Sequence, residues 1–201
     1  MEAQFTDPEV SKAKFESEIS QYRELAADYC ARGWFLTEAS FPIATVLIAL
    51  PQLNPPVLLT GVRFDYTNYD ARPPSVQLVN PFTGEPYRHR ELPTSLNRAV
   101  PVPGAAIPGA PPGIAIQMKT VQPLMQAHDP DEIPFLCIAG VREYHEHPGH
   151  SGDAWELHRA CGAGRIVRLL DVIHKYGAAP IREFQVNLVP QVGLALNEAP
   201  E

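Results

Sequence analysis

Proline is the residue that most restricts how this chain can fold, because its ring fixes the backbone φ angle and removes a hydrogen-bond donor. The chain has 201 residues and 22 prolines, and seventeen of these prolines lie between Pro51 and Pro148. That stretch is therefore expected to lack long uninterrupted helices and central strands. Short elements separated by turns are the structure that such spacing favours.

Composition and charge narrow the class of protein. Hydrophobic residues make up 45% of the chain and charged residues 19%, which is typical of one globular domain spanning residues 1–201. The net charge of -7 argues against a nucleic-acid partner. No apolar run reaches the ~20 residues that cross a membrane, and the N-terminus is charged, so we expect a cytoplasmic protein. An odd set of three cysteines argues against a disulfide framework: Cys30, Cys137 and Cys161.

Apolar spacing predicts a helix followed by strands. Residues 7–32 repeat apolar side chains every three or four positions, with Asp7 as the N-terminal cap and Gly33 at the end. Short apolar runs bounded by prolines and turn residues then predict an antiparallel four-stranded meander. The expected strands are residues 34–41, 43–50, 57–66 and 75–80.

The second half of the chain is expected to begin with an irregular proline-rich insertion at about residues 85–134. Residues 135–144 form a β-rich run, residues 164–176 have helical spacing, and residues 184–189 could add a short terminal strand. The order of helix, meander, insertion and C-terminal helix predicts an α+β fold.

A histidine-rich segment, residues 137–153, is the strongest candidate for a functional site. On an extended strand Glu143, His145 and His147 would share one face, and the Pro148–Gly149 turn could return His150 toward them. Imidazole and carboxylate are ligands that Zn(II) prefers, so the segment predicts a metal site. A solvated histidine-rich turn is the alternative. Tyr144 and Trp155 are expected to pack, and Asp153 to cap the next helix.

Cys137 has three open roles: metal ligand, nucleophile, or buried apolar thiol. It shares strand parity with His145, but eight residues of straight strand would separate them by roughly 26 Å at ~3.3 Å per residue. Gly140 is the obvious place for a bend that would bring Cys137 back to the histidines.

The stretch at residues 69–78 reads Tyr-Asp-Ala-Arg-Pro-Pro-Ser-Val-Gln-Leu. It resembles the Tyr-Pro-x-x-Pro-Pro-x-Val-x-Phe stretch of ubiquitin-conjugating enzymes, whose element order also matches residues 7–84 and 135–176. The resemblance implies a ubiquitin-conjugating-enzyme-like fold with Cys137 in the place of the active cysteine. The His-Pro-Asn motif of those enzymes does not precede Cys137, and Asn80–Pro81 is its nearest analogue.

The histidine segment separately resembles a bacterial family of predicted metal-binding proteins described by a Cys-Glu-His-His set. The matching residues are Cys137, Glu143 and two of His145, His147 and His150. Members of that family occur beside ubiquitin-like conjugation proteins, so the resemblance implies a modifier and its activating enzyme as partners.

Three functions are considered, of which the two resemblances imply the first. The leading one is a metal-binding component of a bacterial ubiquitin-like modification system that carries the modifier as a thioester on Cys137, with His145 or His147 assisting proton transfer. The second is a non-catalytic adaptor stabilised by zinc. The third is a metal-dependent hydrolase with Glu146 as the base.

Overall fold

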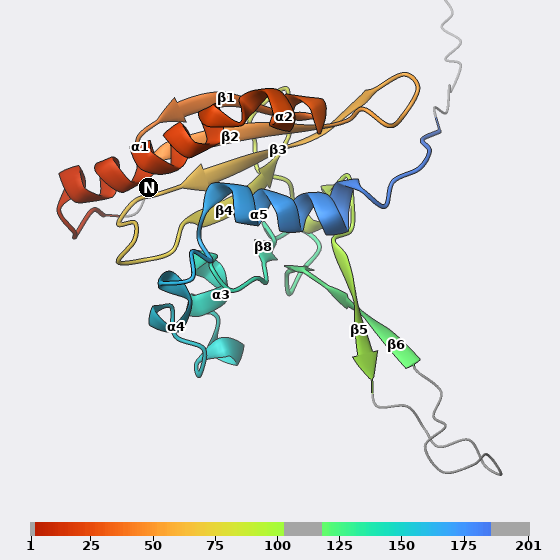
Figure 1. The fold of residues 1–201 in the computed structure, drawn as a ribbon. Helices are drawn as coiled ribbons and strands as arrows, with labels where there is room; N and C mark the ends of the chain where they lie inside the picture. The colour runs from red at the N-terminus through yellow and green to blue at the C-terminus, as the bar shows by residue number, and fades with distance from the viewer. Residues whose placement is uncertain (1–2, 103–117, 186–201) are drawn as a thin grey trace, which may run out of the picture.

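The computed structural model describes residues 3–102 and 118–185 (Figure 1). It is a mixed α+β structure in which helices pack on an antiparallel four-stranded sheet, as the sequence predicts. The sheet order is β1-β2-β3-β4, with strands β1 (Trp34–Ser40), β2 (Ile43–Leu50), β3 (Val57–Asp65) and β4 (Ser75–Val79).

Strand alternation builds the core side of this sheet. Along β2 every second residue is buried, namely Ala44, Val46, Ile48 and Leu50. The register pairs Val46 with Val62, and Val62 in turn with Leu78. Neighbouring apolar residues on one face therefore form a continuous surface for helices to cover.

The prolines bound the strands of the sheet without excluding a central one. β3 has nine residues and lies between β2 and β4, inside the proline-rich stretch. It fits because no proline occurs between Pro56 and Pro73. The expectation that this stretch lacks central strands is therefore wrong: what matters is where each proline falls, not how many there are.

The N-terminal helical region is two helices, α1 (Pro8–Glu24) and α2 (Ala26–Ala31), where the sequence predicts one. Asp7 caps α1 as expected, because its side chain accepts a hydrogen bond from the Glu9 N–H at 2.9 Å. Leu25 leaves the helical conformation with φ −113° and ψ 18°. The break turns α2 so that Tyr29 packs between Tyr22 and Trp34, with ring centroids 4.7 Å and 5.4 Å away.

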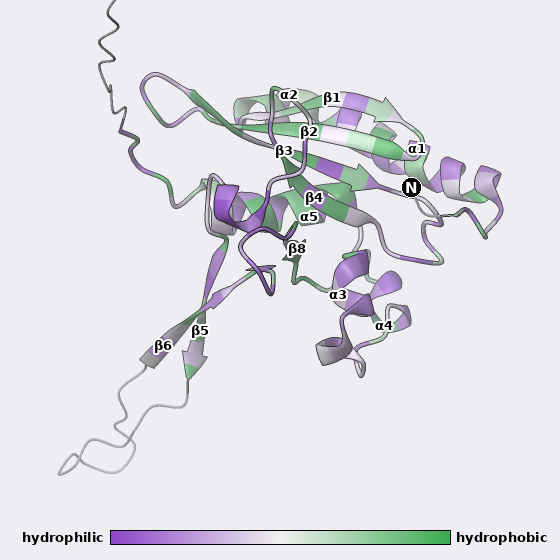
Figure 2. Ribbon diagram, turned by 180° about the vertical axis from the view of Figure 1, so that it is seen from behind, coloured by the Kyte–Doolittle hydropathy of each residue, from purple (hydrophilic) through white to green (hydrophobic). Residues whose placement is uncertain are grey.

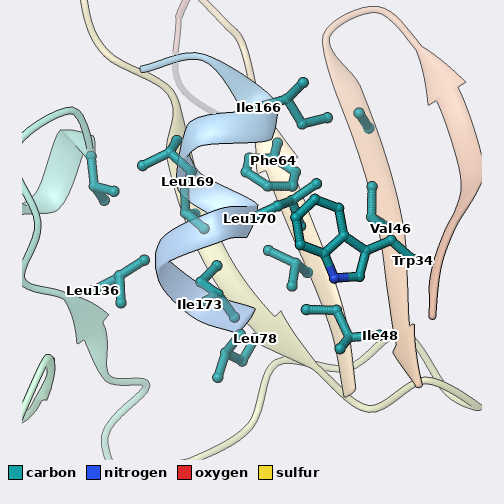
Figure 3. Close-up of a cluster of buried hydrophobic side chains, with 14 of the residues drawn as sticks. Trp34, Val46, Ile48, Phe64, Leu78, Leu136, Ile166, Leu169, Leu170 and Ile173 are labelled. Carbon is teal, nitrogen blue, oxygen red and sulfur yellow. The ribbon is translucent and has the colours of Figure 1, made fainter. Parts of the chain in front are cut away.

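Helix α5 (Ile166–Ile173) completes the core and continues into a π-helical turn, η3 (His174–Ala178). This confirms the helix that the sequence predicts near residues 164–176. Figure 3 shows sheet residues such as Val46 and Phe64 on one side of α5, and Leu136 on the other. The helix, the sheet and the segment that leads to Cys137 therefore share one hydrophobic core, and β8 also contacts β4 directly.

The insertion predicted as irregular contains regular structure. β5 (Asn97–Val102) and β6 (Met118–Pro123) form an antiparallel hairpin that projects from the body in Figures 1 and 2. Pro101 is tolerated there because a two-stranded ribbon consists of edges alone. A short helix, η1 (His89–Glu91), and two short paired strands, β7 (Met125–Gln126) and β8 (Phe135–Leu136), complete the region.

The run predicted as a strand over residues 135–144 ends after two residues of β8. The chain turns at Gly140, whose φ is +106°, and continues as α3 (Arg142–Glu146), η2 (Pro148–His150) and α4 (Glu156–Arg159). The strand parity assumed for Glu143, His145 and His147 is therefore wrong, because a helix places these side chains on different faces.

Two further expectations concern the ends and the environment of the chain. The terminal strand predicted at residues 184–189 falls largely outside the described residues, and residues 184–185 are not in a strand. Within residues 3–102 and 118–185, no helix has the length and apolar character needed to cross a membrane.

Candidate functional site

Cys137 lies directly after β8, a strand that pairs with β7 and contacts β4 of the sheet. Its backbone N–H donates to the Leu124 carbonyl at 2.7 Å, and the Leu124 N–H donates to the Leu96 carbonyl at 2.7 Å. This ladder fixes Cys137 beside the base of the β5–β6 hairpin. The residue is 7% exposed, so its thiol is largely shielded from water.

The bend that the sequence predicts at Gly140 is confirmed, and it is stabilised by His145. The Gly140 N–H donates to Nε2 of His145 at 3.2 Å, and Nδ1 of His145 lies 2.8 Å from the Asp153 carbonyl. A glycine is required at this bend, because a Cβ there would lie 2.4 Å from the Ala163 carbonyl oxygen. Burial lowers the pKa of His145, which favours the neutral ring that this arrangement needs.

His150 is the histidine that reaches the thiol. Its Nε2 lies 3.3 Å from Sγ of Cys137, within hydrogen-bonding distance for sulfur. The short helix η2 positions His150, and the turn is held by His147, whose Nδ1 accepts a hydrogen bond from the Gly149 N–H at 3.1 Å. The turn predicted at Pro148–Gly149 therefore does bring His150 back toward Cys137.

The electrostatic environment of Cys137 makes a base necessary for thiol chemistry. Burial raises the pKa of the Cys137 thiol, and the positive charge of Arg98 on β5 partly offsets this effect by lowering it. The thiol is then protonated near neutral pH and is a weak nucleophile. The His150 imidazole, with Nε2 at 3.3 Å from the sulfur, is placed to accept its proton.

Tyr144 and Asp153 complete the surroundings of His150. The Tyr144 ring stacks on the His150 ring with a centroid distance of 4.0 Å and an interplanar angle of 24°. The Tyr144 hydroxyl donates to Oδ2 of Asp153 at 2.6 Å, and Oδ1 of Asp153 lies 2.5 Å from Nε2 of His158. Asp153 does not cap α4, whose N-terminal residue has no side-chain cap, so that expectation is wrong.

The remaining predicted ligands have other partners, although the His147 ring lies 5.6 Å from the His150 ring, centroid to centroid. Glu143 accepts a hydrogen bond from the Ser75 hydroxyl on β4, and its second carboxylate oxygen is buried without a hydrogen-bond partner. The His147 ring stacks on Phe135 with a centroid distance of 5.1 Å. Glu146, the base of the hydrolase reading, forms an ion pair with Arg72.

The donor set falls short of what a zinc ion requires. Of the five predicted ligands, the structure brings together Cys137 and His150, which are a suitable thiolate and imidazole. Both ring nitrogens of His145 already contact backbone groups. Across the part of the chain that the structure describes, no group of three or more such side chains is arranged to hold a metal. The geometry thus fits a reactive thiol better than a metal centre.

Comparisons with known proteins place these features in a family context. A family model described as Y4jH-like, of the Y4jH family, matches residues 6–181. The protein y4jH of Sinorhizobium fredii (strain NBRC 101917 / NGR234) is 42% identical to this chain over 192 residues. The match covers 96% of this chain and 94% of the relative, so it includes the whole segment around Cys137.

Proposed function

Since the chain belongs to the Y4jH-like family, whose name specifies no activity, we propose a function from its own geometry. It carries a ubiquitin-like modifier as a thioester on Cys137, within a bacterial ubiquitin-like modification system. The observation on which this proposal rests is the pairing of the Cys137 thiol with His150 Nε2 at 3.3 Å. Nucleophile and base within hydrogen-bonding reach are the signature of an activated thiol.

The proposed reaction begins with proton transfer from the Cys137 thiol to His150. The resulting thiolate attacks the carbonyl carbon of the modifier's C-terminal thioester on the activating enzyme. A new carbon–sulfur bond forms at Cys137, the bond to the activating enzyme's cysteine breaks, and that departing thiolate takes the proton back from His150. Attack by an acceptor amine then forms an amide and releases Cys137 as a thiol.

His150 takes the role that the sequence suggests for His145 or His147. His145 holds the Gly140 bend through both ring nitrogens, and His147 holds the turn before His150. Both therefore shape the backbone around the reacting pair. Arg98 adds positive charge near the thiol, where the oxyanion of the tetrahedral intermediate would develop.

The architecture supports a ubiquitin-conjugating-enzyme-like fold as part of this proposal. The chain runs from an N-terminal helical region through a four-strand meander and a region of short strands to Cys137, and then to a helix that packs on the sheet. This is the element order of the family that residues 69–78 resemble. The proline pair of that stretch, Pro73–Pro74, lies against Arg142 just after the cysteine.

The test is intact-mass spectrometry of the tagged full chain, isolated from its native host without reductant. We expect an adduct with the mass of a small protein that dithiothreitol removes. The variant Cys137→Ser should hold the adduct as an oxyester that dithiothreitol does not remove. Cys161→Ser, which replaces an exposed cysteine, is the matched control and should keep the reducible adduct.

Two results would overturn the proposal. One is the absence of any adduct on Cys137 and on its serine variant. The other is about one zinc per purified chain that is lost on Cys137→Ala and on His150→Ala, since a thiolate bound to zinc is not free to carry an acyl group. Zinc of that kind, with a melting temperature lowered by a chelator, would instead favour the adaptor.

A further inference from the structure

We propose that Tyr144 and Asp153 are positioning residues that hold the His150 imidazole in the orientation in which it can accept the Cys137 proton. The inference rests on the proposed function, in which His150 is the base. It adds two residues to which neither the sequence patterns nor the family match assigns a role in the reaction.

The first contact is the ring stack between Tyr144 and His150. A centroid distance of 4.0 Å at an interplanar angle of 24° is a close, nearly parallel stack. Such a contact restricts rotation of the imidazole about its χ2 angle, because turning the ring would drive its edge into the tyrosine face. The stack therefore selects the ring plane in which Nε2 faces the sulfur of Cys137.

The second contact prevents the tyrosine from moving away. The Tyr144 hydroxyl donates to Oδ2 of Asp153 at 2.6 Å, a short bond of the charge-assisted kind. These hydrogen bonds, from Tyr144 and from His158, hold the pKa of Asp153 below its usual value. The carboxylate is therefore ionised, and remains a good acceptor, over the pH range in which a thiol transfers its proton.

Asp153 is itself anchored by its neighbours. Oδ1 of Asp153 lies 2.5 Å from Nε2 of His158 on α4. The backbone carbonyl of Asp153 lies 2.8 Å from Nδ1 of His145. The carboxylate thus links α3, which carries Tyr144, to α4. The chain of contacts runs from α4 through Asp153 and Tyr144 to His150, and it ends at the thiol.

A positioning role predicts a specific kinetic pattern, because orientation changes how readily a base takes a proton and not how reactive the thiolate is once formed. Loss of the Tyr144–His150 stack or of the Tyr144–Asp153 hydrogen bond should slow reactions of Cys137 near neutral pH. At high pH hydroxide removes the thiol proton, so the same loss should leave the rate unchanged. A purely structural role of Tyr144 would alter both rates together.

The experiment measures alkylation of Cys137 by iodoacetamide at pH 7 and at pH 10, in the full chain with Cys30→Ser and Cys161→Ser. We expect Tyr144→Phe, which keeps the ring and removes the hydroxyl, to slow the pH 7 rate about threefold to tenfold. Tyr144→Leu and Asp153→Asn should slow it at least as much. All three should match the parent at pH 10. The control is Tyr176→Phe, at a tyrosine on η3 outside the Tyr144–Asp153–His150 contacts, which should match the parent at both values.

His150→Gln separates failure of this inference from failure of the proposed function. If His150→Gln slows the pH 7 rate while Tyr144→Phe and Tyr144→Leu do not, the positioning role of Tyr144 is wrong, and the role of His150 as the base is supported. If His150→Gln leaves the pH 7 rate unchanged, His150 is not the base, and the proposed mechanism is wrong. Equal slowing of the Tyr144 variants at both pH values would show a structural role alone, and would overturn the inference.

Discussion

The Arg142 side chain fastens the segment that carries Cys137 to the end of the sheet. The residue is 6% exposed, and its guanidinium donates to the backbone carbonyls of Asp65, the last residue of β3, and of Thr67 and Pro73 in the loop between β3 and β4. The Arg142 backbone N–H also donates to the Pro74 carbonyl at 2.9 Å. A single residue thus holds the start of α3 to the end of β3 and to the loop that leads to β4.

We expect Arg142→Met to lower the free energy of unfolding by about 2 to 4 kcal/mol, because buried carbonyls lose charge-assisted donors and find no others. Urea unfolding followed by circular dichroism measures the change. Arg90→Met is the matched control: Arg90 is 57% exposed, its ion pair with Asp131 is on the surface, and its loss should cost less than about 1 kcal/mol. Equal losses in the two variants would contradict this role of Arg142.

The site was predictable from the sequence only in part. The density of histidines marked the segment, and Gly140 marked its bend, because a glycine between apolar residues is a place where chains turn. The choice among histidines was not predictable, since it depends on a short helix where strand parity was assumed. Tyr144 gave no signal of its own, because a tyrosine that packs and a tyrosine that positions a base look alike in sequence.

Among the elements, α1 and α5 are joined by an unusual cap. α5 has no side-chain cap from its own N-terminal residue, and Glu18 of α1 instead accepts a hydrogen bond from the Ile166 N–H at 3.3 Å. Glu18 is 8% exposed. Burial raises its pKa above the ordinary value of 4.5, while this backbone hydrogen bond and Arg165 act in the opposite direction.

The raised pKa predicts how stability depends on pH. The folded state binds the Glu18 proton more tightly than the unfolded chain does, so its contribution to stability is complete below pH 4.5. That contribution is lost as the pH rises through the folded pKa. We therefore expect the unfolding free energy of the parent, minus that of Glu18→Gln, to be larger at pH 4 than at pH 8. Urea titrations at the two pH values measure it, and the reverse order would refute the prediction.

The sheet was the most predictable set of elements, and the insertion was the least. The strands of the meander each combine apolar alternation with turn residues at both ends, so their predicted bounds differ from the structure by one residue at most. β5 and β6 have little such pattern, because a hairpin that projects from the body buries neither face. The break at Leu25 between α1 and α2 was not predictable, because no proline or glycine marks it in the sequence. The break allows Tyr29 to pack against Tyr22 and Trp34.

At the scale of the whole molecule, the α5 residues and Leu136, the neighbour of Cys137, belong to one hydrophobic core, so the site depends on the same packing as the sheet. Leu170 is fully buried between α5 and the sheet. We expect Leu170→Ala to lower the free energy of unfolding by about 2 to 5 kcal/mol through lost burial and a cavity. Leu157→Ala, at a leucine that is 69% exposed, should change it by about 0.5 kcal/mol or less. Thermal or urea unfolding compares them, and a similar loss in both would argue against this core.

The pairing of Cys137 with His150 also has a meaning for chain entropy. The contact closes a loop of only 13 residues, whereas the bonds from Arg142 to Asp65 and from Trp155 to Asp70 span 77 and 85 residues. The entropic cost of closure grows with loop length, though slowly. The thiol and its base can therefore meet through a short local closure, and only their attachment to the sheet requires the distant parts of the chain to come together.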